Sequence, residues 1–172
     1  MDQYFSIECK TLISKSREIA INLGYDYIST VHIFLADCEI SSPISIKRFA
    51  FSDENKYLKF KTQYSLSEVN YLDNFNDSIP LTKEAESAIR LGQKETTITG
   101  FNMTYPFHIL IGCFKAENSV LADCFKNDPN VIENLMKYYK ELGAFDVKKT
   151  TVGEENNKRT NPFKSLLKLF KK

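Results

Sequence analysis

The sequence has little glycine and proline and no tryptophan. Only 6 Gly and 5 Pro occur in 172 residues, whereas 42% of the residues are hydrophobic and 26% are charged. Glycine and proline mark the tight turns between short strands, so their scarcity argues against a turn-rich β fold and favours helices. The length suits one domain of roughly 145 residues plus a tail, without a second core.

The sequence also lacks long apolar runs and paired cysteines. No stretch approaches the ~18 consecutive apolar residues of a membrane-spanning helix, and the N-terminus shows none of the three regions of a secretory signal. The four cysteines, Cys9, Cys38, Cys113 and Cys124, form no CxxC pair. Reduced, buried thiols are therefore expected, and we predict a soluble cytoplasmic protein.

Basic residues are scarce in the body of the chain and concentrated at its end. Residues 146–172 hold eight Lys or Arg against three acidic residues, a net charge of +5, while the whole chain carries +1. Residues 1–145 therefore carry −4. A nucleic-acid-binding domain shows a basic face on its folded part, so we expect no nucleic-acid partner.

No motif for catalysis, cofactor binding or metal binding is present. The GxxxxGK[ST] phosphate-binding loop is missing. His32 and His108, the only histidines, each fall in the first turn of an apolar helix, where a hydrogen bond to the preceding loop is the expected role. A zinc site from His108, Cys113 and Cys124 lacks the usual ligand spacing, and no group orients a Cys-His pair. We expect a non-enzymatic protein with no catalytic residue, cofactor or metal.

The sequence matches itself at an offset of 76 residues without a gap. The identical pairs are Glu8 and Glu84, Ile13 and Ile89, Gly24 and Gly100, His32 and His108, Ile33 and Ile109, and Phe49 and Phe125. A fixed period indicates duplication of one structural unit. We place the first repeat at about residues 4–50, a connector at about 51–79 and the second repeat at about 80–143.

The first repeat predicts three helices. Ser6 fits the N-cap of a helix that Gly24 ends, because glycine adopts the left-handed conformation without steric cost. Thr30 is the expected N-cap of a second helix over residues 31–38, and Pro43 opens a third. The apolar stripe of the first helix consists of Phe5, Cys9, Leu12, Ile13, Ser16, Ala20 and Leu23.

The second repeat predicts the same order with a weaker first helix. Thr82 is the expected cap and Gly100 the expected stop, but residues 96–99 are poor helix formers, so we predict fraying there. The apolar second helix covers residues 107–114, and the spacing from Val131 to Leu142 predicts a closing helix. In the connector, a helix over residues 65–72 and an extended stretch over residues 57–64 are alternatives.

These residues resemble the N-terminal domain of the Clp ATPases. The segment LGYDYISTVHIFL, residues 23–35, is similar to the family signature, approximately LGHNYIGTEHILLGL, and residues 100–112 keep mainly its Gly, its His and its apolar run. The resemblance covers about residues 1–145. It implies an all-α, pseudo-twofold double repeat of a four-helix unit, with about eight helices, that captures adaptors or substrates; no ATPase ring follows.

The resemblance also implies candidate binding residues. Phe5 and Leu81 occupy the two hydrophobic surface positions that open the family's repeats, so an apolar groove is expected. The family often has a glutamate before each histidine, and in some members these glutamates bind phosphorylated arginine. Here Val31 and Phe107 stand in their place and cannot pair with a guanidinium. We expect Phe5, Val31, Leu81 and Phe107 to contact a partner with a different specificity.

The C-terminus adds a second feature. Residues 146–161 have the composition of a disordered linker, and residues 162–172 form a basic amphipathic tail. In this tail Phe163, Leu166, Leu167 and Phe170 share one helical face, largely away from the lysines. A segment this short is not a stable helix alone, so we expect it to fold on a partner, on its own body or, weakly, on an anionic membrane surface.

The combined prediction is a non-catalytic protein- or peptide-binding module that acts as an adaptor or accessory factor. Its expected partners are a Clp-type AAA+ ATPase, a Clp protease or their substrates. Two alternatives stay open. One is a peripheral membrane scaffold anchored through residues 163–172, and the other is a sequestering protein that competes with full-length Clp N-terminal domains.

Overall fold

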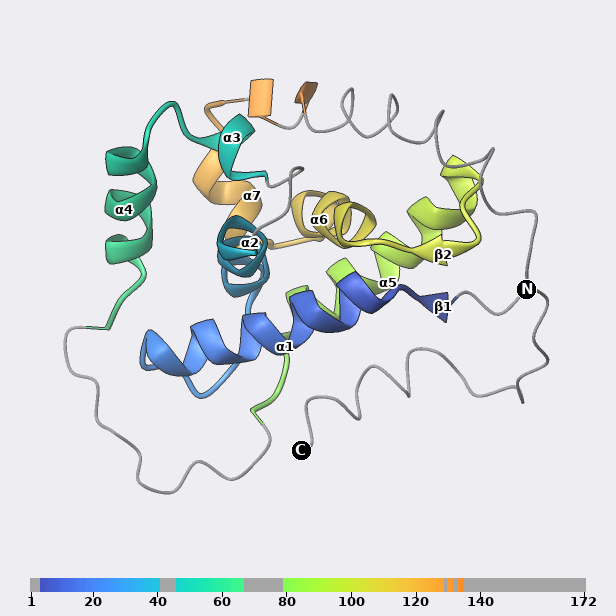
Figure 1. The fold of residues 1–172 in the computed structure, drawn as a ribbon, viewed down its shortest axis with the longest axis horizontal. Helices are drawn as coiled ribbons and strands as arrows, with labels where there is room; N and C mark the ends of the chain where they lie inside the picture. Colours follow the sequence, from blue (N-terminus) through green and yellow to red (C-terminus); the bar gives the residue numbers. More distant parts are fainter. Residues whose placement is uncertain (1–3, 41–45, 67–78, 129, 132, 135–172) are drawn as a thin grey trace.

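The computed structural model describes residues 4–40, 46–66, 79–128, 130–131 and 133–134, which form a mostly helical fold (Figure 1). The first half contains β1 (Tyr4–Phe5), α1 (Ile7–Asn22), α2 (Thr30–Glu39), α3 (Lys47–Ala50) and α4 (Glu54–Gln63). The second half contains α5 (Lys83–Thr99), β2 (Met103–Thr104), α6 (Pro106–Lys115) and α7 (Val120–Phe125). The predicted helical class is confirmed, and the two short strands are an addition.

The predicted limits of α1 are confirmed, but the predicted cap of α2 is wrong. The Ser6 side chain accepts a hydrogen bond from the backbone N–H of Cys9 at 3.2 Å, and Gly24 follows α1 with φ +89°. The N-cap of α2 is Ser29, and Thr30 is its first helical residue. The side chain and N–H of Thr30 are bound instead by a carboxylate from the other half of the chain.

α5 has the limits that its two caps predict, but its last turn is better ordered than predicted. Thr82 caps its start and Gly100, with φ +76°, ends it, as expected. The predicted fraying of residues 96–99 is wrong, because the helix continues to Thr99. The hydroxyls of Thr96 and Thr99 donate to backbone carbonyls one turn earlier, at 3.1 and 2.7 Å. These bonds satisfy the threonine side chains within the helix instead of letting them compete with its backbone bonds.

α5 and α6 approach each other backbone to backbone. A Cβ atom on Gly112 of α6 would lie 2.0 Å from the carbonyl oxygen of Ala88, and one on Gly92 of α5 would lie 2.7 Å from the carbonyl oxygen of His108. Only glycine fits at either position without a shift of the neighbouring backbone. The separation of the two helices is therefore set by two residues that have no side chain.

An aromatic cluster joins the two halves of the core. The ring of Phe34 on α2 lies 6.0 Å from Phe51, 5.7 Å from Phe60, 6.4 Å from Phe114 and 5.4 Å from Phe125, measured between centroids. These separations are typical of favourable aromatic pairs. Because the rings come from α2, α4, α6, α7 and the residue after α3, their packing holds both halves in one core.

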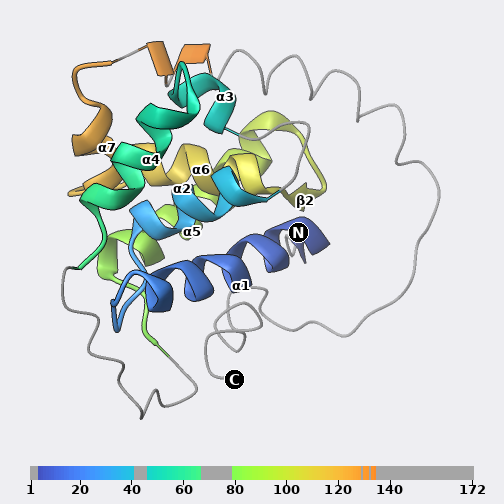
Figure 2. The same cartoon turned by 60° about the vertical axis from the view of Figure 1, so that its left-hand side comes forward.

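The connector contains a helix where two conformations were alternatives. Residues 57–63 belong to α4 and are not extended. The side chain of Lys61 forms an ion pair with Glu39 at the end of α2, and the Tyr57 hydroxyl donates to the same carboxylate at 3.3 Å. α4 stands at the opposite end of the molecule from β1 and β2 (Figures 1 and 2).

Several predicted features lie outside the described residues. They are Pro43, most of the alternative helix over residues 65–72, the linker 146–161 and the tail 162–172. Ser65 and Leu66, the described part of that alternative helix, are not helical. Of the predicted closing helix, only its beginning is described, and residues 130, 131, 133 and 134 are helical there.

Two short backbone pairings connect the halves, and they are related by the 76-residue offset. β1 and β2 are parallel, with Phe5 opposite Thr104, and Ile28 forms a parallel bridge with Leu81. Adding 76 to Phe5 gives Leu81, and adding 76 to Ile28 gives Thr104. Ser6, which follows Phe5, donates its N–H to the carbonyl oxygen of Thr104 at 2.9 Å, and Thr82, which follows Leu81, donates its N–H to the carbonyl oxygen of Ile28 at 2.9 Å.

Candidate functional site

The structure places the four predicted partner contacts around these pairings, mostly in the core. Phe5 is 7% exposed, Val31 1% and Phe107 9%, while Leu81 is partly exposed. A partner at the surface would therefore reach Leu81 more easily than the other three. The predicted tail contacts, Phe163, Leu166, Leu167 and Phe170, lie outside the described residues.

A surface that the sequence analysis missed lies beside Phe5. Thr104 is fully buried, so its neighbours Met103 and Tyr105 face the opposite way along this extended segment. Both are partly exposed, as is Phe101, and Tyr4, paired with Met103 across the strands, is 45% exposed. We name Tyr4, Phe101, Met103 and Tyr105 the aromatic ridge. The alternation of apolar and polar residues over 101–105 is the signal that could have revealed it.

Ring packing fixes the shape of the aromatic ridge. The Phe101 ring lies 5.6 Å from Tyr105 at an interplanar angle of 70°, and Phe107 lies 5.3 Å from Phe101 and 6.1 Å from Tyr105. Phe107 is parallel to Tyr105 within 5°. The nearly buried Phe107 thus supports the ridge from below. Such mutual packing holds the exposed rings in place before any partner arrives.

The two histidines position the turns before α2 and α6, as predicted. Nδ1 of His32 accepts the backbone N–H of Ser29 at 3.0 Å, and Nδ1 of His108 accepts that of Tyr105 at 3.0 Å. In the neutral ring the proton is then on Nε2, which for His108 lies 2.9 Å from the hydroxyl oxygen of Thr99. Burial lowers the pKa of both imidazoles to about 4.

We expect the protein to lose stability between pH 6.5 and pH 4. In this window the unfolded chain protonates His32 and His108, whose ordinary pKa is 6.5, whereas the folded chain keeps them neutral. The stabilisation present above pH 6.5 is therefore lost as the pH falls towards 4, by at most about 3 kcal/mol for each histidine at 1.36 kcal/mol per pKa unit. Urea unfolding at a series of pH values measures this loss.

The double variant His32→Gln, His108→Gln is the control for the pH effect. Glutamine at the third position of a helix also completes a capping box and does not titrate. Burial raises the pKa of Asp37 to about 6, so this carboxyl group acts in the opposite direction and destabilises the fold as the pH rises through 6. We expect the double variant to show no loss of stability between pH 6.5 and pH 4, because the remaining buried carboxyl group of Asp37 favours the fold as the pH falls. An unchanged slope would contradict the assignment to the histidines.

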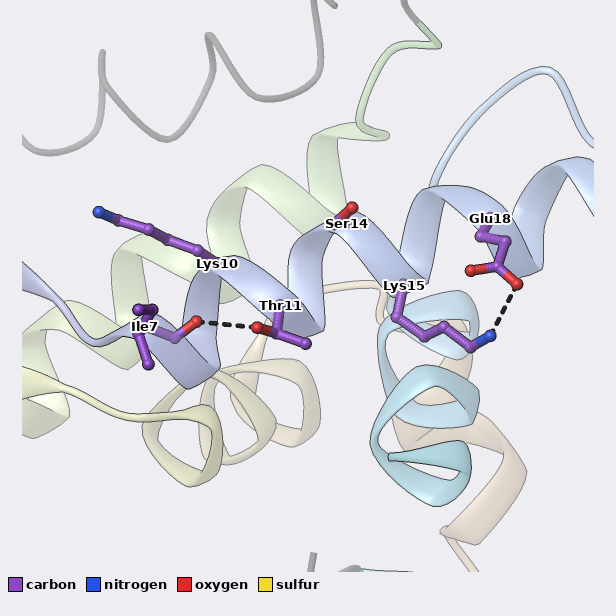
Figure 3. A pocket seen from close by; sticks show the side chains of 6 residues that line it. All are labelled: Ile7, Lys10, Thr11, Ser14, Lys15 and Glu18. Atoms are coloured by element: carbon purple, nitrogen blue, oxygen red, sulfur yellow. Dashed lines mark hydrogen bonds and ion pairs between the residues drawn. The ribbon is translucent and has the colours of Figure 1, made fainter. Parts of the chain in front are cut away.

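An open hollow of about 400 Å³ runs along the outer face of α1 (Figure 3). Its lining residues are Ile7, Lys10, Thr11, Ser14, Lys15 and Glu18. Ile7, three residues after the ridge residue Tyr4 and the first residue of α1, is 75% exposed. At the other end Lys15 pairs with Glu18 at 2.7 Å. The hollow offers an apolar side chain, hydroxyls and charges, and lacks a deep apolar cavity.

A second hollow of about 370 Å³ lies at the start of α5 and is lined by Lys83, Glu84, Ser87, Glu117 and Asn118. Lys83 and Ser87 correspond, at the 76-residue offset, to Ile7 and Thr11 of the first hollow. The carboxylate of Glu84 is already occupied, because it accepts hydrogen bonds from the N–H groups of Thr30 and Val120 at 3.1 and 2.8 Å. The polar groups of this hollow therefore connect α5 to α2 and α7 and are less available to a partner.

The described residues contain no group of three or more His, Cys, Asp and Glu placed to hold a metal ion. In the same part of the chain, no helix combines the length and apolar character needed to cross a membrane. All four cysteines are free, with Cys9, Cys38 and Cys113 buried and Cys124 half-buried. Burial raises the pKa of each buried thiol, which disfavours the reactive thiolate.

Comparison with solved structures identifies the fold. The chain matches the crystal structure of the N-terminal domain of the caseinolytic protease associated chaperone ClpD from Arabidopsis thaliana with a TM-score of 0.59. The match covers 84% of this chain and 97% of that chain at 15% sequence identity. No family description matches the sequence, and no curated protein does. The protein has a Clp N-domain-like fold.

Proposed function

We propose that this chain is a non-catalytic module that binds a protein or peptide through the aromatic ridge and the adjoining hollow on α1. The observation that carries the proposal is the ridge itself, a set of exposed tyrosine, phenylalanine and methionine side chains on a packed support. Tyrosine is enriched among residues that dominate binding energy, and methionine adapts to varied partner surfaces. The Clp N-domain-like fold supports a protein partner.

The proposal extends to the architecture and the partner. We take the two halves to be pseudo-twofold copies of one unit. Two observations support this: the pairing of Phe5 with Thr104 is matched, at the 76-residue offset, by the pairing of Leu81 with Ile28, and His32 and His108 make equivalent hydrogen bonds. The proposed role is that of an adaptor or accessory factor for a Clp-type ATPase, a Clp protease or their substrates. With Val31 and Phe107 at the positions before the histidines, neither of these positions supplies a carboxylate to a guanidinium of the partner.

A photo-crosslinking amino acid at Tyr4 tests this function in cells that express the chain. We expect one or a few discrete protein adducts, whose yield falls about tenfold in the variant Met103→Glu, because a charge on the ridge cannot be desolvated at low cost. The matched control is Leu58→Glu. Leu58 is also a partly exposed apolar residue, but it lies on α4 at the far end of the molecule (Figure 1).

Two outcomes would contradict the proposed surface. One is an adduct whose yield is the same in Met103→Glu and in Leu58→Glu, with both variants shown to be folded by circular dichroism. The other is the same adduct, in equal yield, from a crosslinker at position 58. Once the partner is identified, its degradation rate distinguishes an adaptor from a sequestering protein. An adaptor accelerates the degradation of a substrate, and a sequestering protein slows it.

A further inference from the structure

The chain carries a segment whose chemistry suits the aromatic ridge. In residues 163–172, Phe163, Leu166, Leu167 and Phe170 fall on one helical face, and four lysines accompany them. Ten residues are too few for a stable isolated helix. The segment therefore needs an apolar surface before it can order, and such a surface exists on the same chain.

The ridge offers the apolar area and the size that the segment requires. Within the described part of the chain, Tyr4 is left 45% exposed, and Phe101, Met103 and Tyr105 are covered only in part. A helix from Phe163 to Phe170, eight residues joined by seven steps, would rise about 10 Å. Residues 101–105 extend over at most about 13 Å. The two apolar surfaces thus have similar lengths.

Charge and connectivity favour the chain's own body over another partner. Residues 146–172 carry +5 and residues 1–145 carry −4, so the two parts attract each other. The predicted linker of residues 146–161 has a root-mean-square span of about 22 Å as a flexible coil. A tether of this length gives an effective concentration in the millimolar range. Even a weak contact is then populated.

We propose that residues 163–172 dock on the aromatic ridge of their own chain, with Phe163, Leu166, Leu167 and Phe170 against the ridge. This inference goes beyond the proposed function, because it needs no second protein. Its consequence is regulatory. A partner that uses the ridge must displace the segment, so its apparent affinity falls in proportion to the docked fraction.

The absence of tryptophan from the sequence provides a clean test. The variant Phe170→Trp carries a single tryptophan, whose fluorescence reports on the segment. We expect its emission in the full chain to be blue-shifted relative to a synthetic peptide of residues 163–172 with the same substitution, and the shift to persist on dilution. Adding Met103→Glu should restore the emission of the free peptide, whereas adding Leu58→Glu should leave the blue shift intact.

The other outcomes overturn the proposal. Emission identical to that of the free peptide shows that the segment does not dock. A blue shift lost on dilution indicates a second copy, and one that appears only with phosphatidylserine-containing vesicles indicates a membrane surface. If Met103→Glu fails to fold, Tyr4→Glu replaces it, since Tyr4 is exposed and lies near the end of the chain; a blue shift that survives the folded variant also contradicts docking on the ridge.

The same variants separate this inference from the proposed function. Docking is measured on the isolated chain, so it can be observed even if no partner is captured. Conversely, equal capture of a partner by the full chain and by a chain that ends at Thr160 would leave the proposed function in place. That result would contradict competition between residues 163–172 and the partner for the aromatic ridge. We expect the shortened chain to capture more partner.

Discussion

Replacing Gly112 by alanine is expected to destabilise the fold by more than about 3 kcal/mol, the upper part of the range for overpacked cores. The new Cβ atom would lie 2.0 Å from the carbonyl oxygen of Ala88 and 2.8 Å from the backbone nitrogen of Gly92. These are backbone atoms of α5, so no side-chain rotation can relieve the contact. α5 and α6 would have to separate along the interface that unites the second half.

Gly100→Ala is the matched control for this prediction. Gly100 also belongs to the second half, but nothing lies within 4 Å of a Cβ atom placed there. Its cost comes only from the left-handed backbone, φ +76°, and amounts to about 1–2 kcal/mol. Urea unfolding followed at 222 nm gives both values. An equal loss of stability in the two variants would show that α5 and α6 adjust more easily than their close contact indicates.

The local signals in the sequence were sufficient for most helix ends. Ser6, Thr82, Gly24 and Gly100 act where they were predicted to act, because a cap or a left-handed stop depends on a few neighbouring residues. The N-cap of α2 was misassigned for the opposite reason. Thr30 and Ser29 are equally suitable by type, and the choice between them is set by a carboxylate 54 positions further along the chain.

The elements that tertiary contacts create were not predictable in the same way. β1 and β2 are two residues each, too short for a period of two to be visible, and they exist because the halves meet there. The continuation of α5 through Thr99 contradicts propensity because contacts with β2 and α6 outweigh it: the Thr96 hydroxyl lies 3.0 Å from that of Thr104, and the Thr99 hydroxyl lies 2.9 Å from Nε2 of His108. In each case the deciding interaction lies outside the window in which a sequence pattern is examined.

In the candidate site, too, local sequence signals were informative and the effects of tertiary contacts were not predictable. The family resemblance pointed to Phe5, Val31, Leu81 and Phe107 but carried no information on exposure in this chain, where Val31 lies in the core. Valine carries no charge, so its burial has none of the cost of burying an unpaired carboxylate. The aromatic ridge was visible in principle as alternation over residues 101–105, and its strand partner Tyr4 becomes part of it only through the pairing of β1 with β2.

Replacing Glu84 by glutamine is the second change with a large expected effect. Oε1 of Glu84 accepts the N–H of Thr30 at 3.1 Å, and Oε2 accepts the Thr30 hydroxyl at 2.9 Å and the N–H of Val120 at 2.8 Å. These N–H groups lie at the starts of α2 and α7, where the helix dipole favours a negative charge. One carboxylate therefore fastens three helices together.

Glutamine keeps the shape of Glu84 but only one of its two acceptor oxygens. Its amide nitrogen would face a donor, and either Thr30, which is fully buried, or Val120 would lose its acceptor. Hydrogen bonds to charged groups contribute about 1.5–3 kcal/mol, and an unpaired buried donor costs a similar amount, so we expect a loss of roughly 2–4 kcal/mol. Urea unfolding measures it, and a loss under about 0.5 kcal/mol, typical of surface changes, would contradict this role.

The sequence supplies its own control in Glu8, which precedes Glu84 by the 76-residue offset. Glu8 occupies the same place in the first turn of α1 and is exposed. The residue that corresponds to Thr30 is Pro106, which has no N–H or hydroxyl to donate. We therefore expect Glu8→Gln to change the stability by less than about 0.5 kcal/mol. The hydrogen bonds that Glu84 makes to other helices thus have no counterpart at Glu8. The start of α6 depends instead on His108 and on the packing beneath the aromatic ridge.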